Sequence, residues 1–342
     1  MTEEKGIAVS RKKLLAFLVV ILVCSLSVAG YVIYTMYFTY DVRIAFLTKD
    51  IHHLPLIIAI KKGWFEEYGI KAVFYEYPNG MAEMTAFGSN EIDMGYLGIA
   101  PALNKRLNEG IRVIIVAAVN VNGSAIVVAR NLGINSLEDL KNKLEAGGKI
   151  AHPGWGTVQH FLLTRALTSV GMSVDRINKK SVPMRPGDME VKLHIGEIVG
   201  FIAWEPFCAK AVVEGGAKYL ILSGEIWKNH PCCVIAVHEN FYREHPDIVR
   251  KVLEIHVKAV EWIKEHFEEA VKIAVEWTGM SEDVVRLALQ NVAYIYVPDV
   301  GGIKEYLELL INYEYIKNPP ENVDAFLNEF INTTILESLV GE

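Results

Sequence analysis

A glycine-rich turn at residues 153–157, Pro-Gly-Trp-Gly-Thr, is the segment of this sequence best suited to hold a small molecule. Its two glycines, Gly154 and Gly156, let the backbone approach a ligand closely, and the Thr157 hydroxyl and the free amides of a following helix can donate to an oxyanion or carboxylate. Trp155 adds a flat apolar wall. The alternative is a tight strand-to-helix turn without a ligand, and the residues alone leave both open.

Two adjacent histidines, His52 and His53, follow an apolar segment and precede an expected helix. They could donate hydrogen bonds to an anion, or they could cap the helix. Together with Asp50 they could also bind a metal, but they are neighbours in sequence and lack the spacing of a helical metal site, so we expect no metal. His160, beside Phe161, is typical of a histidine packed in the core.

The loops after the expected strands supply the other candidate contacts, because ligands of parallel α/β lobes bind beyond the carboxyl ends of the strands. Tyr96 is the aromatic residue that we most expect to touch a ligand, whereas Trp204 and Glu205 could wall a cleft or pack at a hinge. These loops show no evident Lys or Arg, which favours a neutral or zwitterionic heterocycle over nitrate or a sulfonate. The full set of candidate ligand-binding residues is His52, His53, Gly80, Tyr96, Leu97, Gly98, Asn120, Gly154, Trp155, Gly156, Thr157, Trp204 and Glu205.

From Asp41 onward, short β-branched segments alternate with amphipathic segments, a pattern that predicts α/β units with mainly parallel strands. Helices are expected at residues 56–68, at 136–144 with Ser136 as N-cap, from Pro101 onward, and through most of the chain after Glu239. Ten strands are too many for one sheet of ordinary size, so we expect two sheets. The strands are expected at residues 42–47, 72–77, 94–97, 113–119, 125–129, 149–152, 180–184, 200–203, 219–222 and 233–237.

The bulk composition agrees with two lobes and argues against nucleic acid as a partner. The chain has 342 residues, of which 51% are hydrophobic, a size at which chains divide into domains. Its 41 acidic and 34 basic side chains leave a net charge of -7, and the only basic cluster is short and N-terminal.

The four cysteines, Cys24, Cys208, Cys232 and Cys233, include no CxxC pair and no histidine at zinc-finger spacing, so we expect no structural zinc site. A bond between the adjacent Cys232 and Cys233 would close a strained ring. Cys208 could pair with one of them. Buried free thiols are the interpretation favoured by the usual role of cysteine as a small core residue.

The N-terminal segment predicts a membrane anchor. Residues 11–13 are basic and precede an uncharged stretch over residues 14–40, longer than the ~20 residues that a membrane helix needs. The basic end is expected in the cytoplasm and the rest of the chain outside the cell or in the periplasm. Cleavage near residues 27–29 stays open as an alternative, and Val23 before Cys24 argues against a lipoprotein.

An ordered set of short motifs resembles the substrate-binding proteins of nitrate, sulfonate, taurine and bicarbonate ABC importers, a family that includes receptors for thiamine precursors. No single motif is decisive, but their order along almost the whole outer domain is specific. The motifs are His53-Leu54-Pro55, Lys62-Gly63-Trp64-Phe65, Gly69-Ile70, Asp93-Met94-Gly95-Tyr96-Leu97-Gly98, Pro101-Ala102-Leu103, residues 134–141, Trp204-Glu205-Pro206-Phe207 and His245-Pro246.

The resemblance implies a type II periplasmic-binding-protein fold, with two α/β lobes around a central cleft, here preceded by one N-terminal transmembrane helix. The expected segments are 1–40 as tail and anchor, 41–125 as the first part of lobe I, 126–231 as lobe II, and 232–342 as the return to lobe I with C-terminal helices.

The function implied is that of a non-enzymatic, cofactor-free receptor. It would capture a small oxyanion, sulfonate or heterocyclic nutrient and pass it to an ABC permease with its ATPase. The alternative is an enzyme on the same fold, of the thiamine-pyrimidine or menaquinone-pathway type. The sequence offers no Ser-His-Asp spacing and no phosphate-binding GK[ST] loop, which favours the receptor.

Overall fold

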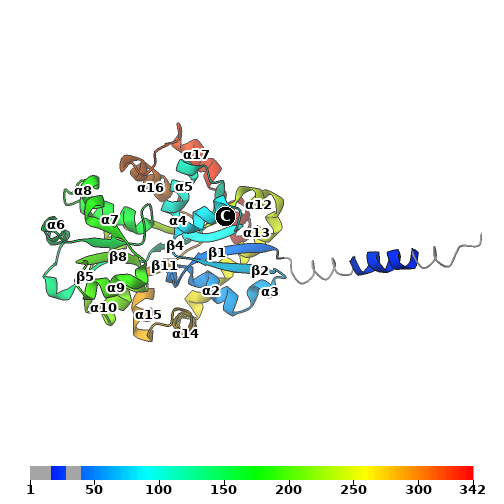
Figure 1. Ribbon diagram of the computed structural model, residues 1–342, viewed down its shortest axis with the longest axis horizontal. Helices are drawn as coiled ribbons and strands as arrows, with labels where there is room; N and C mark the ends of the chain where they lie inside the picture. Colours follow the sequence, from blue (N-terminus) through cyan, green and yellow to red (C-terminus); the bar gives the residue numbers. More distant parts are fainter. Residues whose placement is uncertain (1–16, 28–39, 342) are drawn as a thin grey trace, which may run out of the picture. The chain divides into compact units, whose positions relative to one another are not determined.

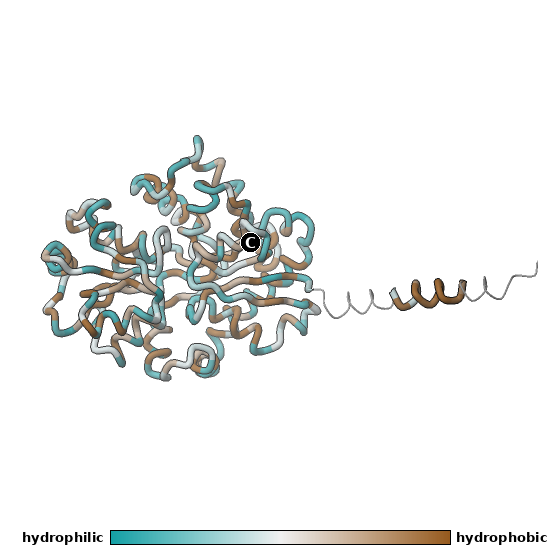
Figure 2. Tube along the Cα trace, viewed as in Figure 1, coloured by the Kyte–Doolittle hydropathy of each residue, from teal (hydrophilic) through white to brown (hydrophobic). Residues whose placement is uncertain are grey.

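The computed structural model describes residues 17–27 and 40–341 and divides the chain into two compact units, Met1–Asp41 and Val42–Glu342 (Figure 1). In the first unit, residues 17–27 form an exposed and mostly apolar helix (Figure 2). The other parts of the expected membrane span, residues 14–16 and 28–39, lie outside the described residues. Within the described part of the chain, no helix is both long and apolar enough to cross a membrane, so the expected transmembrane helix is not shown.

The first sheet of the second unit has six strands in the order β11-β4-β10-β3-β1-β2. β1 pairs in parallel with β2 and β3, whereas β10 runs antiparallel between β3 and β4, and β11 is antiparallel to β4. We call this sheet lobe I, together with the helices of the second unit that precede residue 122 or follow residue 231. The strands are β1 (Val42–Leu47), β2 (Ala72–Tyr77), β3 (Met94–Gly98), β4 (Val113–Asn122), β10 (Pro231–His238) and β11 (Val292–Tyr294).

The helices of lobe I come from both ends of the second unit. Those before β4 are η1 (Ile51–His53), α2 (Leu54–Lys61), α3 (Trp64–Glu67), α4 (Gly80–Gly88) and α5 (Ile99–Glu109). Those after β10 are α12 (Glu239–Glu244), α13 (Pro246–Glu265), α14 (Phe267–Thr278), α15 (Glu282–Leu289), α16 (Val300–Asn312), α17 (Val323–Phe330) and α18 (Thr334–Val340).

Lobe II, between the two crossings of the chain, has a five-stranded sheet in the order β7-β6-β8-β5-β9. Its strands are β5 (Ser124–Ala129), β6 (Ile150–His152), β7 (Ser181–Pro183), β8 (Gly200–Trp204) and β9 (Ala217–Leu222). Its helices are η2 (Arg130–Leu132), α6 (Leu137–Glu145), α7 (Val158–Thr168), α8 (Val174–Lys180), α9 (Pro186–His194), α10 (Phe207–Val213) and α11 (Ser223–Ile226).

The structure contains the ten expected strands and one more, β11, which is too short for its three residues to carry a periodic pattern. The expectation of mainly parallel pairing is wrong for β5, β10 and β11. β10 re-enters lobe I from lobe II and therefore runs against β3 and β4, and β5 runs against β8 and β9. The sheets are mixed because the chain crosses between lobes twice.

Local chemistry sets the helix ends that border the site. Ser136 caps α6 as expected, accepting the N–H of Asp139 at 3.1 Å. Thr157 caps α7 in the same way, accepting the N–H of His160 at 3.3 Å. The single helix expected over residues 56–68 is instead two, because Gly63 lies between them with φ of +69°, a left-handed conformation that suits glycine.

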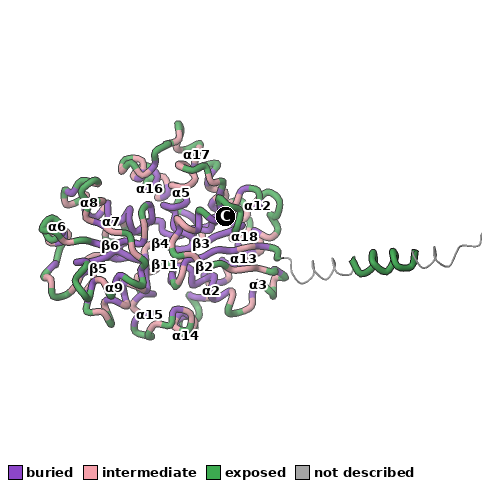
Figure 3. Tube along the Cα trace, in the orientation of Figure 1, coloured by how far each residue is buried: buried purple, intermediate pink, exposed green. Residues whose placement is uncertain are grey.

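The sheets are buried and the outer faces of the helices are exposed (Figure 3). One cluster of buried apolar side chains fills lobe I and continues into α7 of lobe II through Phe161 and Leu162. A smaller cluster, including Met189, Phe201 and Cys208, fills the space between the lobe II sheet and α9 and α10. The two lobes therefore pack directly against each other, and the strand ends of both meet at one seam.

Candidate functional site

The seam between the lobes is closed by main-chain and side-chain hydrogen bonds. The N–H of Ile51 in lobe I donates to the carbonyl of Glu205 in lobe II at 3.1 Å. Asn79 Nδ2 donates to the carbonyl of Pro153 at 3.3 Å. Gly123, the residue between β4 and β5, accepts the N–H of Glu205 at 2.9 Å. These contacts leave three separate spaces along the seam.

The middle space, which we call the central cavity, has a volume of about 10 Å³, enough for roughly one water molecule. Both lobes contribute to its wall. The lining residues are Leu47, Asp50, Gly80, Gly98, Pro101, Thr157, Val158, Gln159, Trp204, Cys232 and Cys233.

The second space, which we call the outer chamber, has a volume of about 600 Å³ and is also lined from both lobes. Lobe I contributes Thr48, Lys49, Glu76, Pro78, Thr278, Gly279 and Met280, and lobe II contributes Arg185, Pro186, Gly187, Asp188, Glu190, Trp204, Phe207 and Lys210. Volumes of ~300–1,000 Å³ are typical of small-molecule sites. The outer chamber therefore has room for a ligand.

Several groups in the wall of the outer chamber are available to a ligand. Lys49, Arg185, Glu76 and Asp188 are exposed, and none of them takes part in an ion pair with any described residue, whereas Lys210 is paired with Glu190. Trp204 borders both the chamber and the central cavity, and its buried Nε1 has no hydrogen-bond partner among the described residues. A buried N–H without a partner is costly, so a ligand acceptor here would be stabilising.

The third space, the rear cavity, has a volume of about 380 Å³ and holds an aromatic cluster. The ring of His160 stacks on His152 with centroids 4.5 Å apart and meets the edge of Trp155 at 4.8 Å. Burial lowers the pKa of His152 to about 3 and that of His160 to about 4, so both rings are neutral. The rear cavity therefore offers no fixed positive charge from its histidines.

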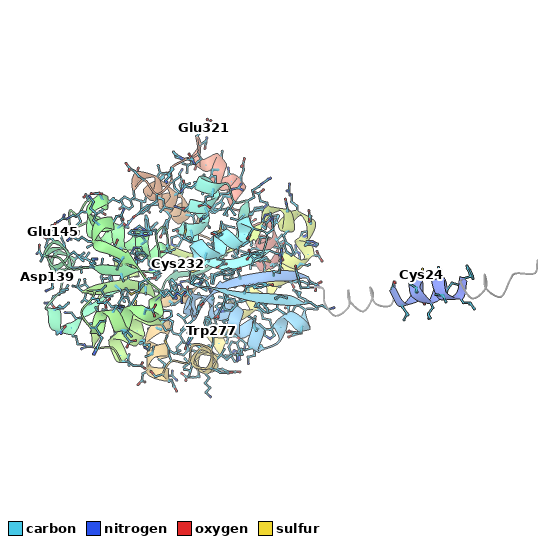
Figure 4. The ribbon with its side chains drawn as sticks, in the orientation of Figure 1. Cys24, Asp139, Glu145, Cys232, Trp277 and Glu321 are labelled. Atoms are coloured by element: carbon cyan, nitrogen blue, oxygen red, sulfur yellow. The ribbon has the colours of Figure 1, made fainter. Side chains whose placement is uncertain are left out.

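A cluster of buried titratable groups lies beside the central cavity, near the middle of the second unit, where Cys232 is labelled in Figure 4. The Sγ atoms of Cys232 and Cys233 are 3.9 Å apart and lie 3.7 and 3.6 Å from Nδ1 of His52. Asp50 Oδ1 is 3.2 Å from the same nitrogen. We call these four residues the thiol cluster.

The members of the thiol cluster shift one another's pKa values. The Cys233 thiol donates to Cys232 and holds the pKa of Cys232 well below its ordinary value, whereas burial raises the pKa of Cys233. Burial favours neutral His52, yet the charges of Asp50 and Cys232 outweigh burial and raise the pKa of His52 to about 10. Burial raises the pKa of Asp50 to about 7.

The geometry of the thiol cluster differs from that of a catalytic triad. A triad places the nucleophile on one imidazole nitrogen and the orienting acid on the other. Here both thiols and Asp50 face Nδ1 of His52, and Nε2 contacts the Gly123 carbonyl at 2.7 Å. No acid is positioned to orient the ring for proton transfer.

Among the candidates from the sequence, Gly80, Gly98, Thr157 and Trp204 line the central cavity. Trp155 and Gly156 line the rear cavity instead, and Gly154 lies beside them at the seam, close to Asn79. His52 is a member of the thiol cluster, and His53 is buried behind it.

The remaining four candidates also lie outside all three spaces. Tyr96 is buried in lobe I, where its hydroxyl is 3.3 Å from Nδ1 of His256, and Leu97 is buried beside it. The amide oxygen of Asn120 accepts the N–H of Cys233 at 3.2 Å. Both oxygens of Glu205 are engaged by residues of the seam, among them Tyr219 and Asn291, each at 2.7 Å. These side chains hold the site together and do not reach the spaces described above.

The sequence reasoning missed the cationic groups. The candidate loops contain no Lys or Arg, but Lys49 follows β1 just before one of them and Arg185 follows β7 in a loop that was not a candidate. Both line the outer chamber. The same strand-end rule would have found Arg185, had the loop after the expected strand at 180–184 been included. Cys232 and Cys233 were missed as wall residues because a cysteine in a strand usually signals only packing.

Comparison with known proteins defines the family. The NMT1-like family matches residues 39–278. The chain belongs to this family. The NMT1-like match covers β1 to β10 and all residues of the central cavity.

Relatives of this NMT1-like protein include two curated binding proteins. A putative aliphatic sulfonates-binding protein of Bacillus subtilis is 28% identical over 69% of this chain and 70% of its own length. A nitrate/nitrite binding protein of Nostoc is 28% identical over 70% of this chain, but over only 59% of its own length. The solved periplasmic nitrate-binding protein of Synechocystis covers 88% of both chains with a TM-score of 0.76 at 18% identity. This likeness confirms the two-sheet periplasmic-binding-protein fold.

Proposed function

We propose that this chain is the extracytoplasmic solute-binding subunit of an ABC importer, which captures a small anionic solute between lobe I and lobe II. The observation that carries the proposal is the outer chamber, which is of ligand size and has walls from both lobes. Membership in the NMT1-like family and the names of the sulfonate- and nitrate-binding relatives support it.

The exposed cations of the outer chamber, Lys49 and Arg185, can hold an anionic head group on the solute, and the exposed carboxylates of Glu76 and Asp188 can take a cationic group at its other end. Arg185 can donate two parallel hydrogen bonds to a sulfonate or carboxylate, and Lys49 faces the same space from the other lobe. Trp204 and Phe207 supply an apolar wall for a short organic tail. A small organosulfonate therefore suits the chamber better than a neutral heterocycle does.

Capture requires that the solute stabilise the closed arrangement. A ligand shifts an equilibrium between open and closed forms only by its difference in affinity for the two. A solute held by Lys49 of lobe I and Arg185 of lobe II has its full set of contacts only when the lobes are together. Delivery then follows when a permease with its ATPase separates the lobes.

The N-terminal segment would hold the receptor beside its permease. The uncharged stretch over residues 14–40 is proposed to serve as a single membrane anchor with the basic end in the cytoplasm. Tethering of this kind raises the local concentration of the receptor at the transporter without any new contact.

The test is thermal unfolding of the purified full chain against nitrate, bicarbonate, taurine, alkanesulfonates of increasing length, thiamine and hydroxymethylpyrimidine. A true ligand at ~100 times its Kd should add about 2.7 kcal/mol of stability. We expect one or a few alkanesulfonates to raise the unfolding temperature. Trp204→Ala should abolish the shift, whereas Trp155→Ala, in the rear cavity, should keep it. A shift that depends on Trp155 and not on Trp204, or no shift with any anion, would contradict the proposal.

A further inference from the structure

In the thiol cluster, two thiols and one carboxylate lie around a single imidazole nitrogen. We propose that Cys232, Cys233 and His52 bind one thiophilic divalent cation of the zinc class, with the fourth tetrahedral position left to Asp50 or to a water molecule. This site lies next to the central cavity and is separate from the outer chamber, so the inference does not rest on the proposed receptor function. It differs from the expectation, drawn from sequence spacing, that the chain has no metal site.

A bulge in β10 brings both thiols to the same place. Consecutive residues of a regular strand point to opposite faces, so adjacent cysteines cannot ordinarily share one ligand. The register of β10 against β4 shifts on both sides of Cys233. The N–H of Cys233 is taken up by the side chain of Asn120, at 3.2 Å from Oδ1. Cys232 and Cys233 therefore both face Nδ1 of His52.

The distances among His52 Nδ1 and the two sulfurs fit a tetrahedral ion, and these three atoms lie within 4.8 Å of one another. Bond lengths of ~2.3 Å to sulfur and ~2.0–2.1 Å to nitrogen correspond to separations of about 3.8 Å between two sulfurs and 3.6 Å between sulfur and nitrogen. The corresponding separations here are 3.9 Å and 3.6 to 3.7 Å. Two thiolates and one imidazole are donors that zinc prefers, and Asp50 Oδ1, 3.2 Å from Nδ1, lies beside them.

Once a cation displaces the Nδ1 proton of His52, the neutral ring is held in the tautomer that a metal ligand needs. Its Nε2 lies 2.7 Å from the Gly123 carbonyl, which can only accept, so the proton of the neutral ring is on Nε2 and the Nδ1 lone pair faces the two sulfurs. A Cβ built on Gly123 would overlap the His52 ring, so the close approach requires glycine. Ligating histidines commonly donate their second N–H to a backbone carbonyl in this way.

Unpartnered polar groups beside the cluster are a second, independent indication of a missing partner. His53 is fully buried, its Nε2 has no hydrogen-bond partner among the described residues, and one of its ring nitrogens lies within 4.8 Å of Asp50 and Cys233 ligand atoms. Neither oxygen of the fully buried Glu83 has a partner in the described chain. No Lys or Arg of the described residues forms an ion pair with Asp50 or Glu83. A buried cation would compensate this concentration of acidic groups.

The site is preformed and has an entrance. Cys232, Cys233 and His52 all belong to lobe I, as does Asp50, so their arrangement does not depend on closure of the lobes. Asp50, Cys232 and Cys233 line the central cavity, which Gln159 and Trp204 of lobe II cover. A cation can therefore enter when the lobes part, and it is sealed from solvent when they close.

The direct test is titration of the full chain with Co²⁺ as a spectroscopic probe, in a reduced, metal-free Cys24→Ser background that removes the exposed thiol. We expect one equivalent of Co²⁺ with thiolate charge-transfer absorption and the intense d–d bands of tetrahedral cobalt, both displaced by one equivalent of Zn²⁺. Cys232→Ser and Cys233→Ser should each weaken binding by more than about 100-fold. Cys208→Ser is the matched control, because Cys208 is equally buried but lies in lobe II, and it should bind as the parent does.

A second measurement keeps the proposal testable if a cysteine variant does not fold. X-ray absorption of the Zn²⁺-loaded Cys24→Ser chain should show two sulfurs at about 2.3 Å and two lighter atoms at about 2.0–2.1 Å. No stoichiometric binding by the reduced chain, or binding that survives both Cys232→Ser and Cys233→Ser, would overturn the site. Trp204→Ala should bind Co²⁺ normally, so failure of the metal site and failure of the solute site give different results.

Discussion

The outer chamber and the thiol cluster lie on the two sides of Trp204, yet they treat polar groups in opposite ways. Lys49 and Arg185 in the chamber are exposed to solvent and lack ion-pair partners among the described residues. His52 and Asp50 in the cluster are fully buried and contact each other. Exposed charges cost little without a partner, whereas buried ones need permanent partners. The polar groups of the outer chamber are therefore suited to an exchangeable ligand, whereas those of the thiol cluster are suited to a permanent partner.

Among buried polar groups, the largest loss of stability is expected for Glu205→Ala, at the seam between the lobes. Its carboxylate accepts from the Tyr219 hydroxyl, the Asn291 amide and the N–H of Ala209, at 2.7 to 2.8 Å. Truncation leaves the buried N–H of Ala209 and the half-buried Tyr219 hydroxyl without this acceptor, and the Asn291 amide keeps only the Tyr219 hydroxyl at 3.2 Å. The change should lower the free energy of unfolding by roughly 3 kcal/mol. Urea denaturation measures it. Glu205→Gln keeps the shape and should cost less, and a loss below about 1 kcal/mol for Glu205→Ala would contradict the role of Glu205 as a seam residue.

Acidification should lower the free energy of unfolding by an amount similar to that expected for Glu205→Ala, because His256 is buried in lobe I. Burial lowers the pKa of His256 from 6.5 to about 4. Because the folded-state pKa is depressed, its contribution is fully present above pH 6.5 and is lost as the pH falls toward 4. The loss is about 3 kcal/mol for this residue. His256→Gln should lose less stability than the parent between pH 7 and pH 4 in urea denaturation.

Other buried histidines titrate in the same range, so the informative quantity is the difference between the parent and His256→Gln. His194→Gln, at an exposed position on α9, is the control and should follow the parent. If the free energy of unfolding fell equally with pH in all three proteins, His256 would not be held neutral by burial.

In the outer chamber, where the charged groups are exposed, we expect a substitution to change ligand affinity without changing stability. Arg185→Gln removes a charged donor from the outer chamber and should weaken binding of the anionic solute by about 1.5–3 kcal/mol, roughly 10- to 100-fold. Its unfolding temperature without ligand should not move, because the side chain is exposed. Calorimetric titration measures the affinity. Arg176→Gln, on the same lobe but outside the chamber, should bind like the parent, and equal losses in both variants would indicate only a long-range charge effect.

The smallest effect is expected for Tyr96→Phe. The Tyr96 hydroxyl is 3.3 Å from Nδ1 of His256, whose Nε2 donates to the Ala118 carbonyl at 3.0 Å. Removing this hydroxyl should cost about 1 kcal/mol of stability. Solute affinity should not change, because Tyr96 is buried away from the chamber. A loss of affinity at unchanged stability would place Tyr96 in the ligand site after all.

The sequence predicted the fold well because strands and helices leave local patterns. The expected strands at 42–47 and 72–77 coincide with β1 and β2, and the Ser136 cap is where its side chain predicted it. The pairing direction was less predictable, since nothing local in residues 231–238 reveals that β10 returns from the other lobe.

The site was predicted less well, for reasons that depend on side-chain direction. Tyr96 was favoured because it lies near the end of a strand, but its ring is buried against His53 and His256 of lobe I, whereas Gly98, at the strand end itself, lines the central cavity. The thiol cluster joins residues 180 positions apart through a bulge, and neither separation nor bulge is visible in the residue spacing. Arg185 was within reach of the strand-end rule and was missed only because one loop was left out.

Capture between two lobes can be tested most directly by hydrogen exchange of the full chain with and without the best solute from the thermal panel. The account predicts added protection on both walls of the outer chamber, in peptides that cover Thr48 to Pro78 and Arg185 to Glu190, and little change around Trp155 in the rear cavity. Protection confined to one lobe, or centred on the rear cavity, would contradict capture in the outer chamber.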